Sequence, residues 1–291
     1  MTQSLEARTR RILEQYGIHA RKKFGQNFLI SQSVVDGIIG AAGITKEDTV
    51  LEIGPGIGTM TRSLAEAAGN VAAVEIDGTL KPVLDEVEEE FGNVTILYQD
   101  ILRTDLPGLC ARFGGGRPLK VVANLPYYVT TPILMQLLEN RGLFESITVM
   151  VQKEVAERIC AEPGSREYGA ITLAVAYYSD PEIALDVPPS SFIPRPNVDS
   201  SVLVLKAHGE PPVRTDEKLM FAVIRASFNQ RRKTLVNGIV HGLVVDGKPA
   251  GISREQAQEV LGRCGFAPTV RGETLSLADF AAIAGALREI V

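Results

Sequence analysis

Short apolar runs alternate with amphipathic stretches over residues 49–151 of the chain. The runs are short enough for buried strands, and between them apolar residues recur at the spacing of a helix face. The pattern predicts strands over 49–53, 71–76, 94–98, 119–123 and 146–151, with helices over 59–68, 79–90, 105–112 and 131–140. Regular alternation of this kind is typical of a mostly parallel sheet covered by helices on both faces.

The pattern changes on either side of this region. Helices are expected over Gln3–Tyr16 and Val34–Ala42 before it, and over Lys153–Ala161 and Tyr168–Tyr178 after it. Two further strands, Glu182–Val187 and Ser200–Lys206, bring the sheet to seven strands. The segment from His208 to Pro212 is rich in turn residues and is interpreted as a linker. We therefore expect a Rossmann-like α/β, doubly wound domain over residues 1–205 and an all-helical domain over residues 206–291.

A glycine-rich loop follows the first predicted strand of the sheet. Gly54-Pro55-Gly56-Ile57-Gly58 stands between strand 49–53 and helix 59–68, and Glu52 lies two residues before its first glycine. Glycines at such a turn let the backbone approach a ligand closely. A dinucleotide fingerprint would place the third glycine one residue later. The observed spacing resembles motif I of the S-adenosylmethionine-dependent methyltransferases, whose loop cradles the methionine part of that cofactor.

Acidic side chains stand at the ends of successive predicted strands. Glu75 ends the strand after the glycine loop and can accept from both hydroxyls of a ribose. Asp100 follows the next strand and can accept from an adenine amine. Each acid alone is more often a loop residue or helix cap, but open α/β sheets bind ligands where strands of this kind end. A cofactor site at this edge is predicted.

A second polar turn, Asn124-Leu125-Pro126-Tyr127, follows the apolar run 119–123. The Asn124 side-chain oxygen and a neighbouring carbonyl can accept both hydrogens of a planar amine, and the Tyr127 ring can stack on the heterocycle that carries it. The alternative is a strand-to-helix turn in which Asn124 caps the following helix.

Composition and charge narrow the function classes. The chain has 291 residues, 45% hydrophobic content and a net charge of −5. No apolar run is long enough for a membrane span, no secretory signal is recognised, and the three scattered cysteines indicate reduced thiols and no zinc site. Lys and Arg exceed acids by six to two over residues 1–30 and by twelve to nine over 206–291, whereas acids dominate the middle by 24 to twelve. Basic ends are compatible with RNA binding despite the acidic total.

The ordered motifs together resemble the bacterial small-subunit ribosomal RNA adenine dimethyltransferases nearly from end to end. The stretches that carry the resemblance are 23–29, 52–58, 74–77, 99–100, 124–128, 151–158, 192–200 and 228–235. The resemblance implies transfer of methyl groups from S-adenosyl-L-methionine to the N6 amines of two adjacent adenosines. These adenosines lie in a hairpin loop near the 3′ end of 16S rRNA, within the 30S subunit or its precursor. We also expect a monomeric cytoplasmic enzyme without a membrane partner.

The resemblance also assigns roles to individual residues. Cofactor-binding residues are expected to be Asn27, Leu29, Gly54, Glu75, Asp100 and Asn124. The catalytic group is expected to comprise Asn124, Pro126, Tyr127 and Phe192. In this group Asn124 and the Pro126 region accept from the target amine, and Tyr127 and Phe192 sandwich the extruded adenine. No general base is needed before transfer, and the three histidines lie outside all the motifs.

Basic residues in two places are candidates for RNA contact. Arg21, Lys22 and Lys23 precede the first of the matching loops, and Arg231-Arg232-Lys233 lies in the helical domain. A solvated basic face is the alternative for both. The basic excess at the N-terminus favours RNA contact for Lys22 and Lys23, and for the second cluster a role in tying the domains together is equally open.

Four other functions remain to be weighed. A nicotinamide dehydrogenase leaves the Asn124 turn unexplained. A DNA adenine methyltransferase would more often carry a target-recognition insert. A macrolide-resistance 23S rRNA methyltransferase shares fold and reaction, but residues 151–158 and 228–235 favour the small-subunit enzyme. A factor that mainly checks small-subunit assembly stays compatible with the sequence.

Overall fold

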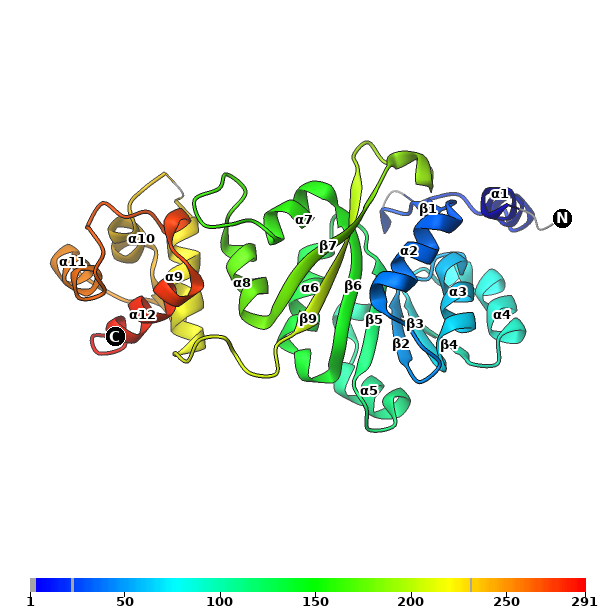
Figure 1. Ribbon diagram of the computed structural model, residues 1–291, viewed down its shortest axis with the longest axis horizontal. Helices are drawn as coiled ribbons and strands as arrows, with labels where there is room; N and C mark the ends of the chain where they lie inside the picture. The colour runs from blue at the N-terminus through cyan, green and yellow to red at the C-terminus, as the bar shows by residue number, and fades with distance from the viewer. Residues whose placement is uncertain (1–3, 22–23, 231) are drawn as a thin grey trace. The chain divides into compact units, whose positions relative to one another are not determined.

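The computed structural model describes residues 4–21, 24–230 and 232–291 (Figure 1). The chain forms two compact units. The first comprises Met1–Ala156 and Asp180–Ala207, and the second comprises Glu157–Ser179 and His208–Val291. The first unit holds the predicted sheet.

The elements of the first unit follow the predicted order. Its α-helices are α1 (Leu5–Gln15), α2 (Gln32–Ala42), α3 (Thr59–Ala67), α4 (Lys81–Glu90), α5 (Leu106–Gly114), α6 (Thr130–Glu139) and the first part of α7 (Lys153–Ile159). Its strands are β1 (Phe28–Leu29), β2 (Thr49–Ile53), β3 (Asn70–Glu75), β4 (Val94–Tyr98), β5 (Leu119–Asn124), β6 (Phe144–Gln152), β7 (Ser179–Val187), β8 (Phe192–Ile193) and β9 (Ser200–Ala207). Among the described residues it also contains the single-turn 3₁₀ helices η2 (Gly78–Leu80), η3 (Ile101–Arg103), η4 (Arg141–Leu143) and η5 (Pro189–Ser191).

Seven strands form one sheet in the order β4-β3-β2-β5-β6-β9-β7. Strands β2 to β6 pair in parallel, and β9 pairs antiparallel to β6. The chain runs outward from β2 through β3 to β4 and then returns to β5 on the other side of β2. Because right-handed crossovers in opposite directions place their helices on opposite faces, α3 and α4 cover one face and α5 and α6 the other. The predicted doubly wound sheet is confirmed, and its switch point lies between β2 and β5.

The central strands are buried on both faces. Val50, Leu51, Val121 and Val122 have no exposed surface, as expected for parallel strands between two helical layers. This explains why the sequence pattern there is a continuous apolar run with no alternation. Helix α2 lies beside α3 and carries Val35 and Ile38 into the same core.

A two-stranded ribbon, β1 with β8, is absent from the predicted elements. Phe28 pairs with Ile193 and Leu29 with Phe192, antiparallel. Strands of two residues have no detectable periodicity, so their pairing depends on the tertiary structure. The ribbon ties the N-terminal segment to the proline-rich stretch after β7.

The second unit contains mainly helices. These are α8 (Ala170–Tyr178), α9 (Glu217–Phe228), α10 (Leu235–Gly242), α11 (Arg254–Arg263) and α12 (Leu277–Leu287), with the 3₁₀ helix η6 (Gly272–Thr274). Residues 157–179 belong to this unit, whereas the sequence placed all of 1–205 in the first domain. Aromatic contacts account for the difference. The Tyr178 hydroxyl donates to Glu217 Oε1 at 2.6 Å, and its ring stacks on Phe221 with centroids 5.9 Å apart.

The expectation of an all-helical C-terminal domain needs one correction. Strands β10 (Val244–Val245) and β11 (Lys248–Pro249) form a short hairpin. Its two turn residues, Asp246 and Gly247, have φ of 49° and 76°. Positive φ at both positions is the requirement of a type I′ turn, which Asp-Gly favours. The dipeptide Asp246-Gly247 after two valines is the feature of the sequence that could have predicted this hairpin.

Candidate active site

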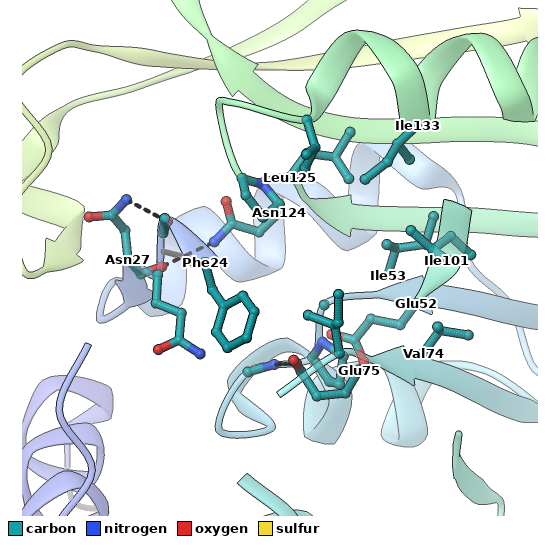
Figure 2. Close-up of a pocket in the computed structure, with 18 of the residues that line it drawn as sticks. Phe24, Asn27, Glu52, Ile53, Val74, Glu75, Ile101, Asn124, Leu125 and Ile133 are labelled. Carbon is teal, nitrogen blue, oxygen red and sulfur yellow. Dashed lines mark hydrogen bonds between the residues drawn. The ribbon is translucent and has the colours of Figure 1, made fainter. Parts of the chain in front are cut away.

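A cavity of about 290 Å³ opens at the carboxyl ends of β2, β3 and β5 (Figure 2). Its wall includes the glycine loop, the ends of those strands and the segment before β1. Of the predicted site residues, the structure brings eight together here, namely Asn27, Leu29, Gly54, Glu75, Asp100, Asn124, Pro126 and Tyr127. Phe192 is not part of the wall.

The glycines of the loop serve different purposes. All three have positive φ, 71° at Gly54, 59° at Gly56 and 77° at Gly58. A Cβ on Gly58 would lie 2.7 Å from Val87 Cγ2, so this glycine allows α3 to pack against α4. A Cβ on Gly54 would meet nothing closer than 4.0 Å. Gly54 is therefore required for the backbone turn, and its open side faces the cavity.

The Glu75 carboxylate is fixed at the end of β3. Its Oε2 accepts from Gly56 N at 3.1 Å and its Oε1 from Asp77 N at 2.7 Å. Burial raises the pKa of Glu75, and the two backbone donors oppose that rise. A carboxylate accepts more than two bonds, so Glu75 keeps capacity for ligand hydroxyls. Figure 2 shows it bound to the glycine loop.

Glu52 is a buried acid on the same wall, next to Glu75 in Figure 2. It has no exposed surface, and neither carboxyl oxygen has a hydrogen-bond partner among the described residues. Burial raises its pKa to about 8, and the negative charge of Glu75 adds to the rise. At neutral pH the group is therefore mostly protonated, which lowers the cost of burying it.

Asp100 caps a 3₁₀ helix and also lies on the cavity wall. Its Oδ1 accepts from Leu102 N at 3.0 Å and caps η3. Its side chain is 34% exposed, with Oδ2 3.9 Å from Arg103 Nε, and it lies on the cavity wall. A capping aspartate can thus still accept from a ligand amine.

Asn124 ends β5 and faces the segment before β1. Its Nδ2 donates to the Asn27 carbonyl at 3.2 Å, drawn as a dashed line in Figure 2. This bond sets the orientation of the amide, because only the nitrogen can donate. Oδ1 accepts no hydrogen bond from the described residues, so it is available to a ligand donor.

Pro126 and Tyr127 continue the turn. The Pro126 carbonyl accepts from Val129 N at 3.1 Å and from Thr130 Oγ1 at 3.2 Å, which occupies both of its lone pairs. The Pro126 carbonyl thus closes the turn that leads into α6, whose N-cap is Val129. The Tyr127 hydroxyl bonds Ser200 Oγ at 2.8 Å, which holds the half-buried ring at the cavity.

The aromatic partner expected opposite Tyr127 lies elsewhere. Phe192 is 1% exposed, packs in the core and pairs with Leu29 in the β1–β8 ribbon. The structure does not bring its ring to the cavity. Tyr128 instead lines the cavity and is 59% exposed. Sequence reasoning missed this second tyrosine, although it stands directly beside the first.

The N-terminal segment supplies one side of the cavity. Leu29 is buried in β1, and the Asn27 side chain donates to the Gly25 carbonyl at 3.2 Å. In Figure 2 the Phe24 ring points into the cavity that it helps to line. Phe24, like Ile76 and Leu102 on the wall, was not singled out from the sequence. A signal for the last two was available, since each follows a predicted acidic ligand within two residues.

The basic clusters are only partly described. Arg21 Nη1 lies 3.3 Å from Asp77 Oδ1, so its charge is paired within the first unit. Lys22 and Lys23 lie outside the described residues, as does Arg231. Arg232 and Lys233 are exposed in the second unit. Contact with RNA stays a prediction for all of them.

The predicted ligand groups share one cavity. The cavity wall carries a carboxylate at Glu75 that can accept from hydroxyls, a backbone turn without a side chain at Gly54, and an amide oxygen at Asn124.

No helix of the described residues is long and apolar enough to cross a membrane. No group of three or more metal-ligating side chains occurs in the part of the chain that is described.

Known proteins share both the sequence and the fold. The family model of ribosomal RNA adenine dimethylase matches residues 17–259. The ribosomal RNA small subunit methyltransferase A of Lachnoclostridium phytofermentans is 50% identical over 96% of this chain and 95% of its own. The enzyme of that name from Shouchella clausii is 50% identical over 97% and 94%.

Solved structures agree. A dimethyladenosine transferase from Plasmodium falciparum superposes with a TM-score of 0.73 at 25% identity, over 90% of this chain and 98% of its own. The 23S rRNA methyltransferase ErmE superposes with a TM-score of 0.67 at 22% identity, over 90% and 100%, which supports the fold alone. With a family match over most of its length and relatives at half identity, the chain belongs to the ribosomal RNA adenine dimethylase family.

Proposed function

We propose that this protein transfers methyl groups from S-adenosyl-L-methionine to the N6 amines of two adjacent adenosines in a hairpin loop near the 3′ end of 16S rRNA. The observation that carries the proposal is the amide of Asn124. Its free Oδ1 stands at the end of β5, on the same cavity as Gly54 and the fixed carboxylate of Glu75. Membership of the family and relatives named for the small subunit favour this substrate over 23S rRNA.

The residues on the cavity suit the cofactor. Glu75 would accept from the ribose hydroxyls, and Asp100 from the adenine amine. Gly54 would lie beneath the methionine part, where its missing Cβ leaves room. Asn27 and Leu29 would close the site from the N-terminal segment. Acidic residues on the wall favour a positively charged ligand.

The cofactor, when bound, supplies an activated methyl group on a sulfonium. The protein's own contribution is alignment, since a bound amine in line with its donor gains much of the rate by proximity. An adenine amine is a weak nucleophile because its lone pair is conjugated with the ring. Asn124 Oδ1, by accepting one of its hydrogens, turns the nitrogen lone pair towards the donor.

Base stacking would hold the target. Tyr127 is anchored by Ser200 and presents its ring at the cavity. Tyr128 is the exposed aromatic side chain beside it. Each stacked ring contributes about 1–3 kcal/mol to binding of an unpaired base. A role for Phe192 as the second stacking partner would require it to leave the core, and we therefore assign the stacking to the two tyrosines.

The substrate is 16S rRNA, offered within the 30S subunit or its precursor. The enzyme acts as a monomer in the cytoplasm. An adenine in a hairpin loop can enter this cavity at a lower free-energy cost than a paired adenine, because no base pair has to be broken.

Parallel methylation assays test the proposal. Labelled S-adenosylmethionine is offered with the protein to undermethylated 30S subunits, to 50S subunits and to DNA. Label is expected in 30S subunits alone, as dimethyladenosine. Label in 50S subunits or in DNA, with none in 30S subunits, would refute the assignment.

A further inference from the structure

Asp77 is a buried acid that the proposed reaction does not use. It follows Glu75 by two residues and is 2% exposed. Its Oδ1 accepts from Thr79 N at 3.2 Å and Thr79 Oγ1 at 2.7 Å, the contacts of an ordinary cap for η2. Capping does not explain its Oδ2, which accepts from Gln26 Nε2 at 3.0 Å, across 51 residues of chain.

Arg21 and Gln26 bind Asp77 together. Arg21 Nη1 lies 3.3 Å from Asp77 Oδ1. The Arg21 backbone N–H donates to Gln26 Oε1 at 2.9 Å, so both ends of the Gln26 amide are used. Burial raises the pKa of Asp77, but bonds from Thr79 and Gln26 and the charge of Arg21 lower it overall. The carboxylate is thus held ionised against the loop.

The loop held in this way forms part of the cavity wall. Phe24, Gly25, Gln26 and Asn27 all line it. A Cβ on Gly25 would lie 3.4 Å from the Tyr128 ring, so the loop rests on that ring. At its far end the Asn27 carbonyl accepts from Asn124 Nδ2. The loop therefore spans from Asp77 to the amide proposed to align the target.

Asp77 also touches the other end of the site. Its backbone N–H donates to Glu75 Oε1 at 2.7 Å. One residue thus connects the proposed ribose ligand with the loop over the cavity.

We propose that Asp77, Arg21 and Gln26 form a latch that fastens residues 24–27 over the cofactor site. Asp77 is the positioning residue of this latch. The latch slows cofactor release and keeps Asn124 oriented, and it acts through the loop without touching the reacting atoms. This inference rests on the proposed function, because it takes the cavity as the cofactor site.

A double-mutant cycle in the full-length protein tests the latch. Asp77→Asn keeps an oxygen for Thr79 but places an amide opposite Gln26 and removes the charge opposite Arg21. Arg21→Gln removes the other charge and leaves the cap of η2 intact. Hydrogen bonds to charged groups of this kind correspond to roughly 10- to 100-fold in an equilibrium. Each single variant is expected to speed release of labelled S-adenosylmethionine by at least about tenfold, and the double variant to add little more.

The readouts separate a latch from a local structural defect. Asp105→Asn is the matched control, because Asp105 caps α5 through Gly108 N at 3.2 Å and does not line the cavity. It should lower the unfolding temperature slightly without changing cofactor release. Additive effects of the two latch variants, or a normal release rate in Arg21→Gln, would overturn the latch. Wild-type protein that binds no S-adenosylmethionine would overturn the proposed function and the latch together, whereas normal wild-type binding with uncoupled variants overturns the latch alone.

Discussion

Replacing Asn124 tests the part of the site on which the proposed reaction depends. The side chain makes one contact in the structure and has one proposed role. Nδ2 donates to the Asn27 carbonyl at 3.2 Å, and Oδ1 is proposed to accept from the target amine. Asn124→Ala removes both, so its effect must be divided between them.

The contact and the proposed role contribute different amounts of free energy. The bond to Asn27 is neutral and worth about 1 kcal/mol, or roughly fivefold, and its loss acts on the loop before β1. An acceptor that strengthens in the transition state is worth more, because it is already oriented when charge develops. Loss of one such group costs about 10²–10³ in turnover. Asn124→Ala should therefore slow methyl transfer by orders of magnitude while binding of 30S subunits changes little.

Single-turnover transfer at saturating S-adenosylmethionine measures this directly, with enzyme in excess over undermethylated 30S subunits. Asn140→Ala is the matched control, because Asn140 Nδ2 donates to the Gln136 carbonyl at 2.9 Å and lies outside the cavity. It should lose a comparable bond and keep its rate. A rate for Asn124→Ala within about tenfold of wild type would refute the reasoning, since the bond to Asn27 alone would account for it.

Three further predictions follow from the acids and the basic segment. Glu75→Gln should weaken S-adenosylmethionine binding by roughly 10- to 100-fold, through loss of charge-assisted bonds to the ribose, and calorimetry showing unchanged affinity would exclude Glu75 as the ligand. Because the folded-state pKa of Glu52 is raised to about 8, the folded protein binds more protons than the unfolded one, and its stability should fall as pH rises from about 5 to 8. Urea unfolding of Glu52→Gln should lack that part of the pH dependence, and equal slopes for the two proteins would contradict the assignment. Neutralising Lys22 and Lys23 should flatten the log–log salt dependence of RNA binding by a little under one unit per lost phosphate contact, and an unchanged slope would show that RNA is held elsewhere.

Much of the first unit could be predicted from local pattern. Strands between two helical layers must be apolar throughout, so the run 119–123 was recognisable as a buried strand, and its partners likewise. Ligand groups at the carboxyl ends of such strands necessarily meet at one edge of the sheet. Gly54, Glu75, Asp100 and Asn124 therefore share a cavity, as their positions along the chain indicated.

Other features depended on contacts between residues distant in sequence. Phe192 and Tyr128 are both aromatic and both near a motif, yet one is buried in the core and the other is exposed. Phe192 pairs with Leu29 in the β1–β8 ribbon and packs in the core, whereas Tyr128 stands in the turn before α6. Residues 157–179 likewise look like a continuation of the first domain until their tyrosines pack on α9.

The sequence by itself determined the sheet, its glycine loop and the identity of the polar residues at its edge, because backbone hydrogen bonding imposes a short-range period on apolar positions. Only the tertiary structure decided which polar atoms of those residues are bonded within the protein and which are left for a ligand. Asn124 directs its nitrogen to Asn27 and keeps its oxygen open because of a backbone carbonyl 97 residues earlier in the chain. Asp77 binds Arg21 across 56 residues for the same reason. Such contacts arise from packing of the whole unit, and no local period in the sequence encodes them.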